Sequence, residues 1–513
     1  MKRLDLTPIV MAGLAVGVMA LACGEESGQD ESDSMTTLPP LTTSDGMTSN
    51  MPGDDETGDK LDVGGNATGG PNCDNGDVGC TDKIDLLFVI DNSGTMGEEQ
   101  INLARNFSLL IEQLEGLTDS DGMPVNPDVQ IMVTTTDFGN PLCSQFEIPT
   151  YDPSEGAPVA SSCTERLVDF TGLDPVNPVV VEEACTNTCP VPVTPEGDPF
   201  IAFSSEGDNI PDTVMPVDIN GDGVPDSPAA QALSCIGPQG INGCGYESPL
   251  ENMLQALDPR ADWNTGDPDE PPNPRPFLRD DALLAIAVVT DEADCSVMDY
   301  TIMNNPAFQN INPTTMMPAA SSAICWNAGV MCEGPNAMGV YSACTSQNTP
   351  NLQPISRYTD YLIGTLREQQ EKEVIMLGIL GVPLVTERNE DPPFQPTAGG
   401  VFDLVYRNWR DGQYDGTPTG GDILPDEFMG GETAADKQFD FGIGPGCTGQ
   451  DSTGAFTGQA IPPVRVKEVC EALDLGDEPE DTRCCIESIC DEDFSPAIRC
   501  LTGIIQESIV LPG

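Results

Sequence analysis

The chain contains no histidine among its 513 residues. Histidine is the usual general base beside a nucleophilic serine or cysteine, and it is a frequent zinc ligand in hydrolases and deaminases. Its absence therefore excludes the Ser-His-Asp and Cys-His nucleophile systems and every zinc enzyme that depends on histidine. Chemistry based on paired carboxylates, as in glycosidases, is not excluded.

Basic residues are also scarce, because 20 Lys and Arg stand against 84 Asp and Glu, a formal net charge of -64. This charge opposes binding to nucleic acid phosphates or to an anionic membrane face, so we expect no nucleic acid partner. Basic partners and partners bridged by a metal remain open. The acidity suits a salty or calcium-rich exterior, where ions screen the repulsion, and equally a simple need for solubility.

The N-terminus has the pattern of an export signal. Two basic residues precede the apolar run IVMAGLAVGVMALA, which ends directly before Cys23. We therefore expect a secretory signal peptide over residues 1–22, too short for a mature membrane-spanning helix. The Ala-Leu-Ala before Cys23 resembles a bacterial lipobox, which makes Cys23 the candidate for lipidation at the outer membrane or cell surface of a Gram-negative bacterium. The alternative is an ordinary signal peptide followed by a chance cysteine.

Residues 23–72 are rich in Gly, Ser, Thr, Asp and Glu and almost free of aromatic residues. Such a composition predicts a disordered acidic tether, with an average reach of roughly 40 Å as a random coil. The folded region is then expected over residues 73–513.

The cysteine count agrees with an exported protein. Of 19 cysteines, lipidation of Cys23 would leave 18, which is enough for nine disulfides in an oxidising compartment. No zinc-ligand pattern is present. Cys185 and Cys189, and the adjacent Cys484 and Cys485, are interpreted as crosslinks in loops.

Regular elements alternate between strands and helices. Four short apolar runs are typical of strands buried on both faces: 83–90, 128–136, 283–290 and 373–380. Helical patterns follow at 101–114, 250–257, 358–370 and 495–508. This alternation predicts an α/β fold with a doubly wound, mostly parallel sheet covered by helices on both faces, in three layers.

Three long stretches rich in Pro, Gly and Cys separate these elements, at 140–245, 296–352 and 382–485. Structureless loops of this length are uncommon in compact domains. We expect disulfides to order these insertions, which have little hydrophobic core of their own.

A polar turn follows the first predicted strand directly, with the sequence DNSGT over residues 91–95. A hard divalent cation needs oxygen ligands, and the turn supplies the carboxylate of Asp91 and the hydroxyls of Ser93 and Thr95. At the carboxyl end of a strand, where α/β sheets place ligands, these alternate residues can face one point. The alternative is a plain turn in which Asp91 and Ser93 cap the following helix.

At these residues the chain resembles the von Willebrand factor A family, whose metal-ion-dependent adhesion site has the pattern Asp-x-Ser-x-Ser after a first hydrophobic strand. Asp91, Ser93 and Thr95 match, with Thr95 in place of the final Ser. The resemblance covers the order of elements over most of 83–380 and the terminal helix, but not the insertions. It implies a Rossmann-like α/β/α domain whose site holds Mg²⁺ or Ca²⁺ and leaves one coordination position for a carboxylate of a protein or surface ligand.

The resemblance also implies an aspartate after the third strand, and Asp291 fits that position. The family's second-loop Thr has no clean counterpart, since Glu247 and Ser248 lie nearest to the start of the helix there. Together with Asp137, which ends the second strand, they are candidate outer ligands. The implied metal site thus consists of Asp91, Ser93, Thr95 and Asp291.

A second acidic motif, DINGDGVPD, lies in the first insertion. Its D-x-N-x-D-G spacing resembles the first half of an EF-hand calcium loop, in which alternate oxygens and a glycine turn surround the ion. The acid expected at position twelve is replaced by Ala229, and Asp226 is the candidate substitute. We expect Ca²⁺ to brace the insertion through Asp218, Asn220, Asp222, Val224 and Asp226.

These features predict an anchored cell-surface protein of the adhesion type, which binds a partner through a divalent metal and performs no catalysis. Two alternatives remain. One is a carboxylate-based hydrolase of surface polymers, for which the A-type domain is only a scaffold. The other is a purely structural envelope protein braced by calcium.

Overall fold

The structure is a computed structural model of the chain. It describes residues 82–118, 124–144, 151–172, 178–189, 191–221, 223–266, 275–347, 351–417, 420–425, 432–476 and 478–509. The expected signal peptide 1–22, the lipidation candidate Cys23 and the tether 23–72 lie outside these residues. In the described part of the chain, no helix combines the length and apolar character needed to cross a membrane.

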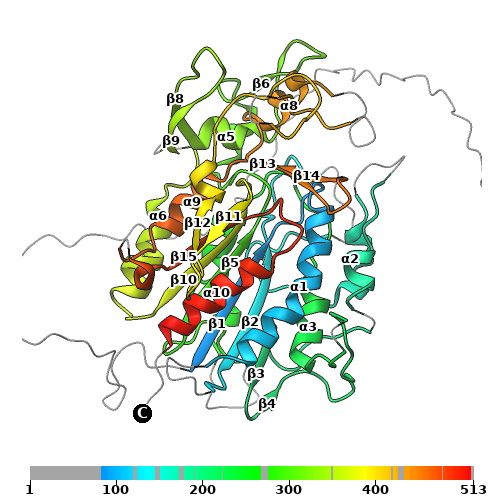
Figure 1. Ribbon diagram of the computed structural model, residues 1–513, viewed down its shortest axis with the longest axis vertical. Coiled ribbons are helices and arrows are strands. Elements are labelled where there is room, and N and C mark those ends of the chain that lie inside the picture. The colour runs from blue at the N-terminus through cyan, green and yellow to red at the C-terminus, as the bar shows by residue number, and fades with distance from the viewer. Residues whose placement is uncertain are drawn as a thin grey trace, which may run out of the picture. The chain divides into compact units, whose positions relative to one another are not determined.

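A seven-stranded, mostly parallel sheet forms the centre of the fold (Figure 1). Its strands, in spatial order, are β15 (Cys484–Ser488), β10 (Val374–Leu380), β5 (Leu283–Val289), β1 (Lys83–Ile90), β2 (Asp128–Thr135), β3 (Ile201–Ser204) and β4 (Gly207–Asp208). The first five are parallel, and β3 and β4 are antiparallel at one edge. The predicted α/β class is confirmed, as are the four predicted strands to within one residue at each end.

Helices cover both faces of this sheet. Side chains of β1 point alternately to the two faces, and both sets are buried and mainly apolar. Leu86, Phe88 and Ile90 belong to one hydrophobic cluster, and Leu87 and Val89 belong to another. The first cluster packs under α1 (Gly97–Glu115), α3 (Pro228–Ile236) and α10 (Ser495–Ser508). The second packs under α4 (Pro249–Ala256), α6 (Ser356–Thr359) with the π-helix Asp360–Arg367, and α9 (Val464–Glu471).

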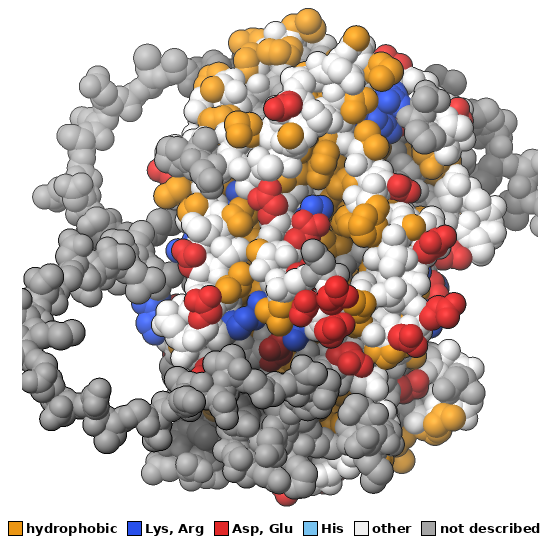
Figure 2. All heavy atoms as spheres, turned by 60° about the vertical axis from the view of Figure 1, so that its left-hand side comes forward, with side chains coloured by type: hydrophobic (Ala, Val, Ile, Leu, Met, Phe, Trp, Pro, Cys, Tyr) orange, Lys and Arg blue, Asp and Glu red, His pale blue; other side chains and the backbone are white. Residues whose placement is uncertain are grey.

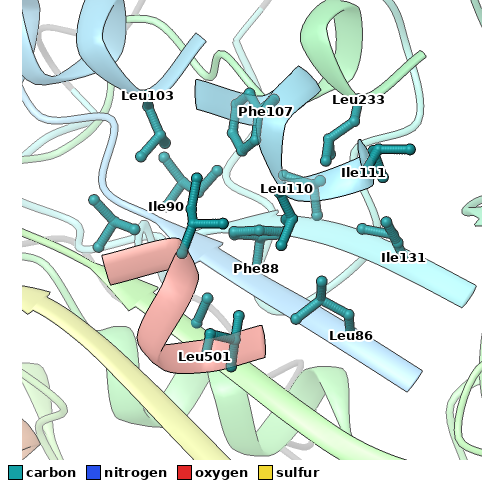
Figure 3. Close-up of a cluster of buried hydrophobic side chains, with 14 of the residues drawn as sticks. Leu86, Phe88, Ile90, Leu103, Phe107, Leu110, Ile111, Ile131, Leu233 and Leu501 are labelled. Carbon is teal, nitrogen blue, oxygen red and sulfur yellow. The ribbon is translucent and has the colours of Figure 1, made fainter. Parts of the chain in front are cut away.

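The first cluster shows how α1 is held on the sheet (Figure 3). Phe88 of β1 meets Phe107 of α1 edge to face, with ring centroids 5.5 Å apart. Leu103 and Leu110 extend the same apolar face of the helix, and Leu501 of α10 approaches from the other side. The helix that begins just after the DNSGT turn is therefore fixed against β1.

The insertions contain more regular structure than the sequence predicts. The 140–245 stretch supplies α2 (Glu183–Thr186), β3, β4 and α3, and the 382–485 stretch supplies α9 and the start of β15. Cys484 and Cys485 do form disulfide crosslinks, as predicted, but they lie in the edge strand β15 and not in a loop, and Cys185 likewise lies in α2. This strand has only five residues, two of them cysteines, so it lacks a recognisable apolar run. The predicted helix 358–370 is also different, because most of it is π-helical.

Two smaller hydrophobic clusters lie outside the main sheet. They are built from residues of 293–352 and 406–464, and include Trp326 and Trp409. The elements of this part lie at the top of Figure 1: β6 (Asn310–Ile311), β7 (Pro318–Ala319), α5 (Ala323–Gly329), β8 (Val330–Glu333), β9 (Ser342–Ser346) and α8 (Ala434–Phe441). Two further hairpins complete the fold: β11 (Val385–Arg388) with β12 (Pro396–Gly399), and β13 (Cys447–Gln450) with β14 (Phe456–Ala460).

Disulfides brace the insertions, as the cysteine count predicts. The described residues form eight of them: Cys143–Cys244, Cys163–Cys185, Cys189–Cys235, Cys295–Cys325, Cys332–Cys344, Cys447–Cys490, Cys470–Cys484 and Cys485–Cys500. The other three cysteines, Cys23, Cys73 and Cys80, lie outside the described residues. On the surface, Asp and Glu side chains spread over the face shown in Figure 2 and Lys and Arg are few, in keeping with the net charge of -64.

Candidate metal centre

Asp91 is held at the carboxyl end of β1 by several hydrogen bonds. Its backbone N–H donates to the Val289 carbonyl at 2.9 Å, and its own carbonyl accepts from the Gln100 amide at 2.7 Å. One carboxylate oxygen accepts from the Ser93 backbone N–H at 2.8 Å, and the other accepts from the Thr290 hydroxyl at 2.5 Å. The side chain is fully buried, so its orientation is set by β1, β5 and the turn between β1 and α1.

The two hydroxyls of the turn lie next to each other. Ser93 Oγ and Thr95 Oγ1 are 3.2 Å apart, with Ser93 buried and Thr95 exposed together with Gly94. The capping alternative is not supported, because the N-cap residue of α1 is Met96 and no side chain caps this helix. Asp91 and Ser93 thus make no contact that helix capping would explain.

Asp291 follows β5 and belongs to the same cluster. It is 5% exposed, and its Oδ1 atom has no hydrogen-bond partner. Burial and, to a smaller extent, the Asp91 charge raise the pKa of Asp291 to about 8, although the Thr95 hydroxyl acts to lower it. Burial likewise raises the pKa of Asp91 to about 6, partly offset by Thr290 and Ser93.

Among the residues that the structure describes, no positive side chain neutralises the Asp91–Asp291 pair. In the described ranges, no Lys or Arg forms an ion pair with Asp91 or Asp291. Two ionised carboxylates buried side by side without a counter-charge destabilise a fold. The arrangement is therefore electrostatically suited to a bound cation.

The candidate outer ligands differ from one another. Asp137 accepts three hydrogen bonds, from Gly139 N (2.9 Å), Cys244 N (3.0 Å) and the Tyr151 hydroxyl (2.8 Å). These three donors account for the position of Asp137 without a metal.

The other two candidate outer ligands, Ser248 and Glu247, differ in their hydrogen bonding. The Ser248 hydroxyl donates to the Cys295 carbonyl at 3.0 Å. Glu247 is 1% exposed, and neither of its carboxylate oxygens has a hydrogen-bond partner. Burial raises the pKa of Glu247 well above its ordinary value, and the charges of Asp91 and Asp137 add to this effect, while the Thr136 hydroxyl acts to lower it.

Three further residues of the centre are absent from the sequence prediction. Thr290 orients Asp91, as described above. Glu99 of α1 and Glu292 after Asp291 are buried carboxyl groups, and burial together with the Asp291 charge raises the pKa of each. For Glu99 a signal was available, since it precedes the buried Leu103 by four residues and so lies on the buried face of the helix.

The chain after β14 covers this end of the sheet. Ile461 N donates to the Asp291 carbonyl at 2.7 Å. A Cβ at Gly458 would lie 2.9 Å from a carboxylate oxygen of Glu99, so β14 passes close above that side chain. Lys437 of α8 lies near Glu292 and partly offsets the raised pKa of that carboxyl. The centre is thus closed on this side and open at Gly94 and Thr95.

In the part of the chain that the structure describes, no group of three or more Asp, Glu or Cys side chains has the geometry of a metal site. The centre predicted here needs only two carboxylates, Asp91 and Asp291, together with two hydroxyls. Hard cations accept such a mixed oxygen set when waters or a partner complete the shell. The donor chemistry, the unpaired Oδ1 of Asp291 and the missing counter-charge all fit Mg²⁺ or Ca²⁺.

The second motif forms a compact turn. Asp218 accepts hydrogen bonds from Gly221 N at 2.7 Å and Gly223 N at 2.9 Å, and both glycines have positive φ. Asp226 accepts from Ile219 N at 2.6 Å, and its Oδ1 is buried without a partner. Asp218 and Asp226 therefore lie on one loop, as the calcium prediction requires.

The other predicted ligands of this loop are less well placed. The Asn220 side-chain amide donates to Glu112 at 2.9 Å, and Val224 is exposed. Asp222 lies outside the described residues. Calcium at this loop stays a prediction.

Replacing Asp218 with Ala tests the calcium loop. We expect the number of Ca²⁺ ions bound per chain to fall by one, because the first ligand of the loop is lost, as measured by isothermal titration calorimetry. The matched control is Asp212→Ala, an exposed aspartate of the same insertion, which should leave the number unchanged. Equal calcium stoichiometry in the Asp218→Ala variant and the wild type would contradict the prediction.

Comparison with known proteins gives no match: no family model, no curated protein and no solved structure matches this chain. The likeness to the von Willebrand factor A family therefore rests on the residues of the centre and on the order of the strands.

Proposed function

We propose that this protein is a lipid-anchored protein of the cell surface that binds a partner through a divalent cation, in a domain of the von Willebrand factor A type. One observation carries the proposal: Asp91 and Asp291 are buried side by side at the end of the sheet, next to two hydroxyls, and no described Lys or Arg neutralises them. Mg²⁺ or Ca²⁺ supplies the missing positive charge.

The strand order supports this assignment. From β3 to β15 the sheet has the order β3-β2-β1-β5-β10-β15, which matches the doubly wound order 3-2-1-4-5-6, although β3 is antiparallel to β2. In such sheets, ligands bind at the carboxyl ends of the strands where the order reverses. Here that point lies between β1 and β5, which are followed by Asp91 and Asp291 respectively.

The roles of the residues follow from their positions. Asp91 and Asp291 would hold the cation, Ser93 and Thr95 would offer hydroxyl oxygens, and Thr290 keeps Asp91 oriented. The exposed tip at Gly94 and Thr95 is where an oxygen of the partner, such as a carboxylate, would reach the ion. No reaction step is required, so the proposal is a binding function and not catalysis.

Removal of the metal and substitution of Asp91 test the function together. We expect purified wild-type protein to bind Mg²⁺ or Ca²⁺ in titration calorimetry, and the Asp91→Ala variant to bind at least about 100-fold more weakly at this centre, because a direct ligand is lost. Binding to an array of acidic peptides should require the cation and disappear with a chelator. The control Asp82→Ala, at an exposed position, should behave as wild type.

The outcomes separate the alternatives. Cation binding without any cation-dependent partner would favour the purely structural role. Unchanged cation binding in the Asp91→Ala variant would remove the basis of the proposal. Turnover of a surface polysaccharide, abolished by one carboxylate substitution, would instead indicate the hydrolase.

A further inference from the structure

The Asn92 side chain links the turn that carries Asp91 to Tyr151. Asn92 lies between two candidate ligands, Asp91 and Ser93, and is 1% exposed. Its side-chain amide donates to the Tyr151 hydroxyl at 2.8 Å. Tyr151 belongs to the first insertion, 59 residues further along the chain. A side chain from the insertion therefore contacts the turn at the residue between the two candidate ligands.

The Tyr151 hydroxyl also contacts Asp137, which follows β2. It donates to a carboxylate oxygen of Asp137 at 2.8 Å. The side chains of Asn92, Tyr151 and Asp137 thus form one chain of hydrogen bonds from amide to phenol to carboxylate. All donors in this chain point the same way, and hydrogen bonds in such a chain polarise one another. Burial and the Asp137 charge raise the pKa of Tyr151, so the phenol keeps the proton that it donates.

Asp137 is itself fixed by backbone groups and by a disulfide. Its carboxylate accepts from Gly139 N at 2.9 Å and from Cys244 N at 3.0 Å. Cys244 is bonded to Cys143, so a covalent link joins the loop after β2 to the segment 243–248 before α4. The carboxylate end of the hydrogen-bond chain is therefore anchored by the backbone and by a crosslink.

The same segment holds the backbone of Asn92. Gly243 N donates to the Asn92 carbonyl at 2.7 Å. A Cβ at Gly243 would lie 2.4 Å from the side-chain oxygen of Asn92, so only glycine permits this approach. That oxygen has no hydrogen-bond partner, so among the described residues the Asn92 side chain bonds to the Tyr151 hydroxyl alone. Loss of the hydroxyl would leave both polar groups of a buried amide unpaired.

We propose that Tyr151 is a positioning residue of the metal centre. Through the Asn92 amide it fixes the turn in which Asp91 and Ser93 lie, and so holds their oxygens where the cation binds. The inference rests on the proposed metal centre and deepens it. Groups that orient metal ligands without touching the metal typically contribute about 10- to 100-fold to metal affinity.

Tyr151→Phe is the central variant, because it removes one hydroxyl and keeps the ring. The measurement is Mg²⁺ and Ca²⁺ titration of the full chain after treatment with a chelator, in the Asp218→Ala background, so that the separate calcium loop does not contribute. We expect Tyr151→Phe to weaken cation binding about tenfold. The matched control is Tyr361→Phe, whose hydroxyl donates to the Leu257 carbonyl at 2.6 Å within the second hydrophobic cluster. It should lose similar stability and keep the wild-type affinity.

A second measurement separates positioning from a loss of stability. Asn92→Ala removes the other end of the same hydrogen bond, so Tyr151→Phe and Asn92→Ala should act through one contact. We expect the double variant to bind the cation no more weakly than Asn92→Ala alone. Losses that multiply in the double variant would show that Tyr151 does not act through Asn92, and would overturn the proposal.

Three other results separate this inference from the proposed function and from a general loss of stability. Unchanged affinity in Tyr151→Phe, with affinity lost in Asp91→Ala, would overturn this inference and leave the proposed function intact. Equal weakening in Tyr151→Phe and Tyr361→Phe would show that lost stability is responsible, and would also overturn it. Unchanged affinity in both Tyr151→Phe and Asp91→Ala would overturn the proposed function itself.

Discussion

The chelated protein should lose stability as the pH rises from about 5 to about 8, and Mg²⁺ or Ca²⁺ should restore it. The native pKa of Asp291 is about 8 and that of Asp91 about 6, against an ordinary value of 3.8. The native chain therefore binds more protons than the unfolded chain in this interval, so the free energy of unfolding falls with rising pH. We expect a loss on the order of 5 kcal/mol, measured by urea unfolding in chelator.

Asp291→Asn is the control for this pH effect. It removes the carboxyl with the higher pKa of the pair, so the chelated variant should depend less on pH and should be more stable than the chelated wild type near pH 8. The added cation should no longer stabilise it. A chelated wild type that is at least as stable at pH 8 as at pH 5 would contradict the electrostatic account of the centre. The overall charge of -64 affects both proteins alike.

Replacing Arg465 with Met should lower the free energy of unfolding by about 3–5 kcal/mol. Arg465 of α9 donates to Asp294 at 2.7 Å, and the two side chains are 2% and 0% exposed. Asp294 also accepts from Ser296 at 2.6 Å, and Arg465 donates to the Gln353 carbonyl at 2.6 Å. The substitution leaves a buried carboxylate without its counter-charge, which costs more than the ion pair contributes.

A second ion pair on the same helix provides the comparison. Lys467 and Glu471 lie 2.5 Å apart, but their side chains are 23% and 42% exposed. Lys467→Ala should therefore change the free energy of unfolding by less than about 1 kcal/mol. The double variant Arg465→Met with Asp294→Leu should recover part of the loss. Similar effects of Arg465→Met and Lys467→Ala would show that burial does not determine the strength of these pairs.

Asp294 and Glu247 are two buried carboxyl groups that differ in their partners. Asp294 is completely buried and has an arginine and a hydroxyl as partners, so its charge is neutralised within the protein. Glu247 lies in a nearby loop and is similarly buried, but the charges that act on it are those of Asp91, Asp137 and Glu292, and only the Thr136 hydroxyl partly offsets its raised pKa. The two carboxyl groups therefore differ in whether a positive side chain compensates for burial.

The sequence by itself determined the class of the fold and the core of the candidate site. The apolar runs at β1, β2, β5 and β10 are nearly continuous and rich in aliphatic residues, so local pattern alone specifies them. Asp91, Ser93 and Thr95 are neighbours in the chain, and the strand before them places them at the sheet edge. The number of cysteines likewise indicated a framework of disulfides, although not its pairing.

Only the tertiary structure decided which distant residues share that edge. Glu99, Glu247 and Glu292 come from three different segments. Helical spacing favours burial of Glu99, and Glu247 is a candidate outer ligand from its position before a helix, but the local sequence does not show that the three are buried at one end of the sheet. Their burial depends on long-range contacts, such as Gly243 against Asn92 and Ile461 against Asp291. The short strand β15 is decided in the same way, since pairing with β10 and two disulfides form it despite a weak local pattern. Local propensity acts over neighbouring residues, whereas the charge environment of a buried group is set by segments that meet only when the chain is folded.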